Sequence, residues 1–151
     1  YVNRLNDLGF EFGDFPLNDF FWRQMHSLKT PAQYFSVMAF TFEAANLDFA
    51  QYYRDIFQSM GDSKTAKILN VVLEDEISHV ALGSFWLKKW REDKSLWQYY
   101  LDSLPWPLTP ARSKGIGFDP QIHDRAVNDP DFIAQLIQFE DPFRVTKRKT
   151  T

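Results

Sequence analysis

Apolar residues recur at helical spacing along two long stretches of the chain, residues 30–60 and 63–90. Within each stretch they fall three or four positions apart, which is the period of an amphipathic α-helix and not of a strand. Thr30 and Pro31 provide an N-cap and a proline at the first helical position, and Gln33 is placed as a capping-box partner. The first long helix is therefore predicted to begin at Thr30.

A single break at Gly61 separates the two stretches, and Asp62 and Ser63 follow it as potential caps of the second helix. Because this connection is so short, the two helices must be antiparallel neighbours. The pattern predicts an all-α fold whose core helices span residues 30–60 and 63–90, with shorter helices around them.

The segment before the first long helix contains two parts of different character. Residues 1–8 are typical of the last two turns of a helix that stops at Gly9. We therefore expect further helical sequence upstream of residue 1. Residues 10–25 are rich in aromatic and turn-forming residues, and they are expected to be a connector that packs through its rings.

The C-terminal third is less regular. A short helix is predicted at residues 95–104, where Pro105 ends it, and another from Pro130 to about residue 140. The whole segment 105–151 is expected to wrap around the helical pair.

Length, charge and the absence of cysteine exclude several classes of function and of binding site. A chain of 151 residues fits a single domain, residues 1–151. The net charge of −3 gives no general attraction to nucleic acid or to anionic membranes, and the basic run 147–149 is expected to be a solvated tail. The longest apolar region, residues 34–50, is too short and too acidic to span a membrane. The absence of cysteine excludes disulfides and thiolate ligands, and it is compatible with the cytoplasmic location that we expect.

Three ionisable residues interrupt the apolar faces of the two helices. Glu43 lies in the first helix, and Glu76 and His79 form a Glu-x-x-His element in the second. Residues three apart on a helix share one face. Burying an unpaired carboxylate is costly, so such groups are usually neutralised, hydrogen-bonded or bound to metal.

The spacing places these three residues at a common level. Glu43 and His79 each lie 18 residues from Gly61, and Glu76 lies 15 residues after it. With a rise of about 1.5 Å per residue, Glu43 and Glu76 differ in height by only about 4.5 Å. The three side chains can therefore meet, and their ligand types suit iron or manganese.

Four sequence elements carry a resemblance to a known family. They are EAANLD at residues 43–48, GD at 61–62, DEISHV at 75–80 and ARSKGIGFD at 111–119. This pattern resembles the ferritin-like family of the domain-of-unknown-function 455 type, over about residues 8–126. The family pattern has Arg-Gly where this chain has Ala45-Asn46, so a contact that the arginine makes is expected to be absent.

The resemblance implies one half of a non-haem di-iron carboxylate bundle, with Glu43, Glu76 and His79 as metal ligands. A di-iron centre, or an iron–manganese one, would be incomplete within these residues. The N-terminal helix pair of the same bundle, or a second copy of the chain, would supply the other ligands. Asp75 and Asp48 are candidate supporting residues, and Asp75 could orient a ligand histidine from the other half.

The expected activity is that of a non-haem di-iron oxidoreductase that uses O2 to oxidise or hydroxylate a small organic substrate. The alternative is a ferritin-like protein that stores metal, or acts as a scaffold, without turnover. No catalytic residue and no nucleic-acid contact is identified by the sequence. His26 and His123 are expected to be surface or capping residues.

Overall fold

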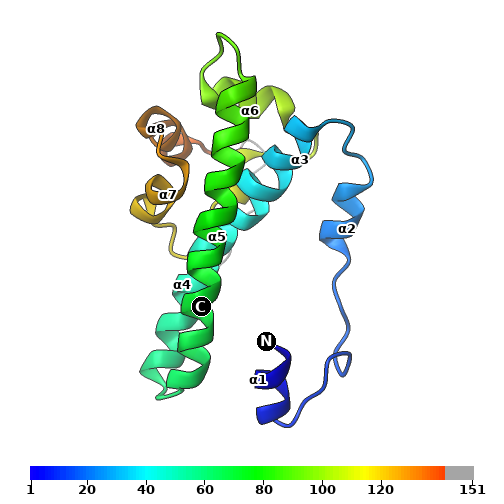
Figure 1. Cartoon of the computed structure of the whole chain (residues 1–151), viewed down its shortest axis with the longest axis vertical. Helices are drawn as coiled ribbons and strands as arrows, with labels where there is room; N and C mark the ends of the chain where they lie inside the picture. Colours follow the sequence, from blue (N-terminus) through cyan, green and yellow to red (C-terminus); the bar gives the residue numbers. More distant parts are fainter. Residues whose placement is uncertain (142–151) are drawn as a thin grey trace.

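The computed structural model describes residues 1–141, and every regular element in that range is a helix (Figure 1). The elements are α1 (Val2–Asp7), α2 (Phe20–Met25), α3 (Pro31–Val37), the π-helical segment η1 (Met38–Glu43), α4 (Ala44–Ser59), α5 (Ser63–Trp90), α6 (Leu96–Ser103), the 3-10 turn η2 (Pro110–Ser113), α7 (Pro120–Val127) and α8 (Pro130–Gln138). The fold of the described residues is all-α, as the periodicity predicts. None of their helices is both long enough and apolar enough to cross a lipid bilayer.

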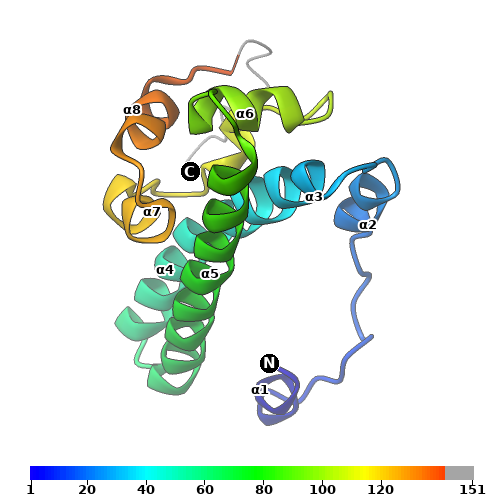
Figure 2. The ribbon, with the colours of Figure 1, turned by 45° about the horizontal axis from the view of Figure 1, so that its top comes forward.

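The segments α3, η1 and α4 follow one another directly, and α5 returns alongside α4 as its antiparallel neighbour (Figures 1 and 2). The Thr30 side chain accepts a hydrogen bond from the Gln33 amide, and the Asp62 side chain accepts one from the Thr65 amide. Each cap satisfies a backbone donor that the first turn of a helix would otherwise leave unpaired. The cap signals thus set where both long helices begin.

A π-helical segment lies in the middle of the first long helix. It is η1, and Glu43 is its last residue. The Thr41 hydroxyl donates a hydrogen bond to the carbonyl of Ser36, five residues earlier. Such π segments are frequent at functional sites because they turn side chains away from the α-helical register. The hydrophobic pattern did not reveal this change.

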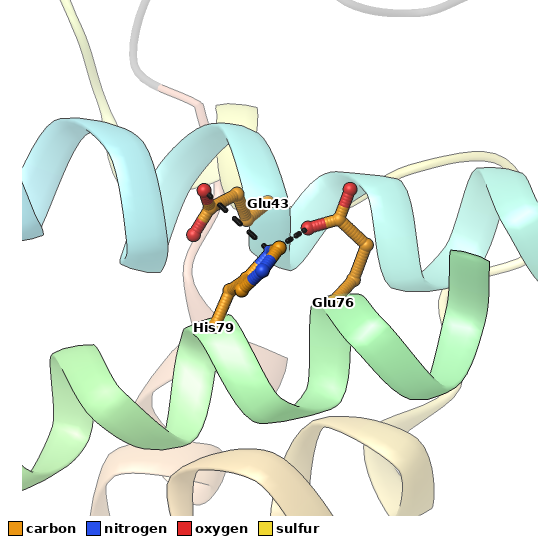
Figure 3. Close-up of side chains that lie close together, drawn as sticks. All are labelled: Glu43, Glu76 and His79. Carbon is orange, nitrogen blue, oxygen red and sulfur yellow. Dashed lines mark hydrogen bonds and ion pairs between the residues drawn. The ribbon is translucent and has the colours of Figure 1, made fainter. Parts of the chain in front are cut away.

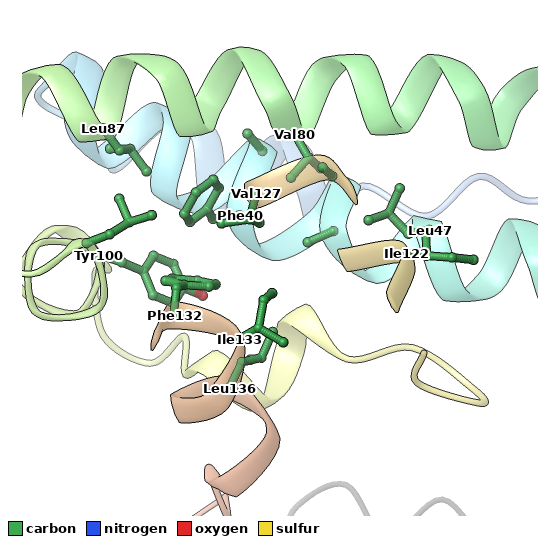
Figure 4. Close-up of a cluster of buried hydrophobic side chains, with 14 of the residues drawn as sticks. Phe40, Leu47, Val80, Leu87, Tyr100, Ile122, Val127, Phe132, Ile133 and Leu136 are labelled. Carbon is green, nitrogen blue, oxygen red and sulfur yellow. The ribbon is translucent and has the colours of Figure 1, made fainter. Parts of the chain in front are cut away.

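One buried core joins the long helices to the C-terminal helices (Figure 4). Phe40 from η1 packs against Tyr100 of α6 and Phe132 of α8, with ring centroids 5.7 and 5.0 Å away. Val80 of α5 and Leu136 of α8 are also fully buried. The C-terminal helices therefore form part of the core, and they do more than cover the helical pair.

A buried chain of hydroxyl groups fixes η1 against η2. The Tyr100 hydroxyl lies 2.9 Å from that of Thr41 and 2.9 Å from that of Ser113. Burial raises the pKa of Tyr100 to about 12, so the phenol stays protonated and can donate one of these bonds. This chain holds together two segments that also border the candidate site.

Gly83 allows η1 and α5 to approach closely. A Cβ atom at this position would overlap the Cβ of Ala39. The two segments that carry Glu43 and Glu76 can therefore pack closely against each other.

The N-terminal residues dock at the turn between α4 and α5. The Arg4 guanidinium donates hydrogen bonds to Asp62, at 2.6 Å, and to Thr65, at 2.7 Å. The aromatic connector contains the short helix α2, and its Phe20 and Phe21 pack against Phe42 as expected. Phe12 and Trp22, in contrast, are about 70% exposed.

Helix α7 is not among the helices predicted from the sequence, in which His123 is expected to be a surface or capping residue. Asp119 caps it and Pro120 occupies its first position. The predicted wrapping segment 105–151 is described only as far as residue 141, and the basic run 147–149 lies outside the described residues.

Candidate metal centre

The structure brings Glu43, Glu76 and His79 together between η1 and α5 (Figure 3). One ligand atom from each residue can be chosen so that all three atoms lie within 4.8 Å of one another. Glu43 comes from the end of η1, and the other two lie one turn apart on α5. The close contact of these helices brings three potential ligands to one point.

Hydrogen bonds orient Glu76 from two sides. Its Oε2 atom lies 3.1 Å from Nδ1 of His79, and its Oε1 atom accepts a 2.7 Å hydrogen bond from the side-chain amide of Asn46. Glu43 Oε1 lies 4.0 Å from the same Nδ1 atom of His79. Asn46 therefore supplies a contact of its own at a position where the resemblance had suggested only a lost one.

The electrostatics of the cluster favour positive charge between the carboxylates. Burial, and then the negative charge of Glu76, raise the pKa of Glu43, although His79 opposes this shift. The pKa of His79 is raised first by its hydrogen bond to Glu76, and the charges of Glu43 and Asp75 add to this effect. A bound cation would offset the repulsion between the two carboxylates.

The cluster is open on the side of His79. The His79 side chain is 55% exposed, whereas those of Glu43 and Glu76 are 26% and 15% exposed. Burial and the negative charge of Glu76 raise the pKa of the phenol of Tyr1, the residue that precedes α1. The sequence did not connect Tyr1 with the cluster.

The two candidate supporting residues occupy different environments. Asp75 is exposed on α5, and it acts on His79 only through its charge. Asp48 is buried, and its hydrogen bonds go to the loop and helix that follow η2. Within residues 1–141, neither carboxylate makes a hydrogen bond with Glu43, Glu76 or His79.

Asp48 is the centre of a buried polar network. It accepts backbone hydrogen bonds from Gly115, at 2.8 Å, and Asp119, at 2.9 Å, and it lies 3.1 Å from Nε2 of His123. The expectation that His123 lies at the surface was wrong, because its side chain is fully buried. His123 lies on the buried face of α7 beside Ile122. Because α7 was not predicted, this helical periodicity was not recognised in the sequence. His26 is exposed, as expected.

A pocket of about 900 Å³ adjoins the cluster, and both Glu43 and Glu76 line it. Aromatic side chains from α2 and from the first long helix form part of its wall, and the loop that begins at η2 forms another part. The hydrogen bonds to Asp48 hold this loop against α4. The sequence did not indicate the pocket, because its walls come from segments far apart in the chain.

We expect the metal-free protein to lose stability as the pH rises through the titration of this cluster. Because the folded pKa of His79 is raised, protonated His79 stabilises the fold fully below pH 6.5, and this contribution disappears above the raised value. Glu43 acts in the same direction, since ionising its buried carboxyl above pH 4.5 costs stability. Urea unfolding in the presence of a chelator, repeated at several pH values, measures how the free energy of unfolding changes with pH.

A His79→Ala variant provides the comparison for this pH series. Its stability should fall less than that of the wild type between about pH 6 and about pH 8, the range in which histidine titrates. Identical pH profiles for the two proteins would show that Glu76 and His79 do not interact in the folded chain.

The comparisons with known proteins identify a family but no characterised relative. A family model described as "Protein of unknown function (DUF455)" matches residues 1–134. No curated protein and no solved structure gave a significant match to the chain. The match covers most of the sequence, so the chain belongs to the DUF455 family.

Proposed function

We propose that Glu43, Glu76 and His79 are ligands of an iron or manganese site in a ferritin-like, non-haem di-iron carboxylate oxidoreductase. The observation that carries this proposal is the convergence of the three ligand atoms within 4.8 Å. Two carboxylates and one imidazole are a donor set that suits iron and manganese. The substrate would be a small organic molecule, oxidised or hydroxylated with O2.

The residues present fit such a metal. Glu43 and Glu76 are largely buried, and the pKa of Glu43 is raised first by burial and then by the negative charge of Glu76. The imidazole of His79 is accessible, and it can exchange its contact with Glu76 for a bond to a cation. Replacing mutual repulsion by attraction to a shared cation favours binding.

The roles of the side chains follow from their positions. Glu76 is held by the Asn46 amide, which leaves its other oxygen directed at the cluster. His79 must lose a proton before it can act as a ligand. When bound, iron would supply the redox chemistry that activates O2. The aromatic pocket wall would keep water away from an apolar substrate beside Glu43.

A complete dinuclear centre requires ligands from another pair of helices, either an N-terminal half of the same bundle or a second copy of the chain. Exposed apolar residues on α5 support this. Leu82 and Phe85 are 52% and 58% exposed, and Leu82 lies one turn from His79 on the same face. A face of this kind is commonly covered by another helix.

Metal storage without turnover remains the competing function. The pocket favours the enzyme, because a volume of about 900 Å³ beside Glu43 and Glu76 is large enough for an organic substrate. A storage site has no need of such a space.

The proposal is tested by thermal unfolding with Mn(II). A ligand that binds only the folded state should stabilise the wild type by about 2.7 kcal/mol at 100 times its dissociation constant. Replacing His79 by alanine should remove most of this gain. His26→Ala is the matched control, because His26 is exposed at the end of α2. The buried His123 is unsuitable for this purpose.

The outcome that contradicts the proposal is equally direct. If Mn(II) and Fe(II) leave the unfolding temperature of the wild type unchanged, Glu76 and His79 form only a hydrogen-bonded pair.

A further inference from the structure

We infer that the pocket beside Glu43 and Glu76 binds an organic acid, with its apolar body between the aromatic walls and its carboxylate on Arg112. This inference rests on the proposed function only in taking the ligand as a substrate. The binding itself depends on the pocket. It therefore assigns a substrate class to the site and can be tested separately from the metal.

The walls of the pocket suit an apolar body. Phe20 and Phe21 of α2 pack edge-on against Phe42 of η1, with ring centroids 5.9 and 4.6 Å away. Trp22 and Phe49 add further aromatic surface. The volume of about 900 Å³ lies in the range of pockets that bind small organic molecules.

Two cationic side chains line the same pocket, and within residues 1–141 they differ in the partners that they bind. The Lys114 ammonium donates hydrogen bonds to the carbonyl oxygens of Ile137 and Phe139, and burial lowers its pKa. The Arg112 guanidinium lies over the ring of Phe20, 5.4 Å from its centroid. Arg112 has no ion pair with a carboxylate in residues 1–141. Its planar donors are suited to binding a carboxylate with two hydrogen bonds.

The charges in the pocket fix the orientation and the class of the anion. Glu43 and Glu76 also line it, and their negative charge repels an anion from their side. The carboxylate therefore lies at Arg112, and the apolar body extends toward Glu43 and Glu76. A phosphate dianion would meet about twice the repulsion from the same two carboxylates. The pocket thus favours a monocarboxylic acid.

Calorimetric titration of the metal-free and the Mn(II)-treated protein with 4-phenylbutyrate and with its neutral amide tests this inference. The two compounds have nearly the same shape and differ in charge. We expect the acid to bind about tenfold more tightly than the amide, because hydrogen bonds to charged groups are stronger than neutral ones. Equal affinities, or no binding of either compound, would overturn the inference.

Variants of Arg112 give the second arm of the test. Arg112→Gln should abolish the preference for the acid, and Arg112→Lys should restore part of it. Arg23→Gln is the matched control, because Arg23 lies on α2 and already pairs with Asp19 at 2.8 Å. A preference for the acid that survives in Arg112→Gln would contradict the assignment of the carboxylate to Arg112.

The failure of this inference can be told apart from the failure of the proposed function. If Mn(II) raises the unfolding temperature but the acid and the amide bind equally, only the substrate class is wrong. If the acid is preferred but Mn(II) has no effect, the pocket assignment stands and the metal site is rejected.

Discussion

Replacing Asp48 with alanine is expected to lower the free energy of unfolding by roughly 3–5 kcal/mol, the cost of removing one partner of a buried charged network. The wild-type carboxylate satisfies the amides of Gly115 and Asp119 and lies against the imidazole of His123. Alanine would leave these buried polar groups without their partner. The loop from η2 to α7 would then lose these hydrogen bonds to α4 and keep the one from Gln51 to Asp119.

Urea unfolding followed by circular dichroism measures this effect. Asp55→Ala is the matched control, because Asp55 lies on the same helix, its side chain is 62% exposed, and it forms an ion pair with Arg54. Exposed ion pairs contribute about 0–1 kcal/mol, so the control should change little. A loss below about 1 kcal/mol for Asp48→Ala would show that the network does not hold the loop.

Replacing Glu76 with glutamine is expected to lower Mn(II) affinity by about 100-fold or more, since altering even an outer-shell partner of a metal ligand costs 10–100-fold. The same change should not weaken the metal-free protein at a pH above the raised pKa of His79, where the imidazole is neutral. The charge of Glu76 raises the pKa of Glu43, so its removal relieves a repulsion. Glutamine can still accept the hydrogen bond from Asn46.

Equilibrium dialysis gives the affinity for Mn(II), and urea unfolding with a chelator gives the stability of the metal-free form. Glu74→Gln serves as the control, because Glu74 is exposed on α5 and binds Arg125 at 3.1 Å. If Glu76→Gln binds Mn(II) as well as the wild type, the two helices do not share a metal through this residue.

The long helices could be predicted because their signals are local. Thr30 and Asp62 are caps that act within three residues, and Gly61 breaks the pattern between them. Helix α5 has the range expected for it, residues 63–90. The rise per residue of an α-helix converts a distance in sequence into a distance along the helix axis. Glu43 could therefore be placed beside Glu76 of α5 from the sequence.

Features that depend on contacts between distant segments could not be predicted in this way. The π-helical segment η1 follows from packing of its buried residues, and no residue type marks its start. The burial of His123 required knowledge of α7, whose Asp119–Pro120 start could have been recognised as a cap and first position. The contact between Asn46 and Glu76 spans 30 residues, and it depends on how η1, α4 and α5 are rotated.

The pocket is the clearest example of such dependence. Phe20 and Phe42 each look like ordinary apolar positions in the sequence, and Arg112 lies far from both. Only the folded chain places the ring of Phe20 between Phe42 and the Arg112 guanidinium.

Anomalous X-ray scattering at the manganese edge, from crystals grown with Mn(II), tests the central claim most directly. We expect a manganese peak at direct coordination distance from Glu43, Glu76 and His79 at once. Crystals without a peak at this position, in which His79 keeps its hydrogen bond to Glu76, would contradict the assignment of these residues as metal ligands.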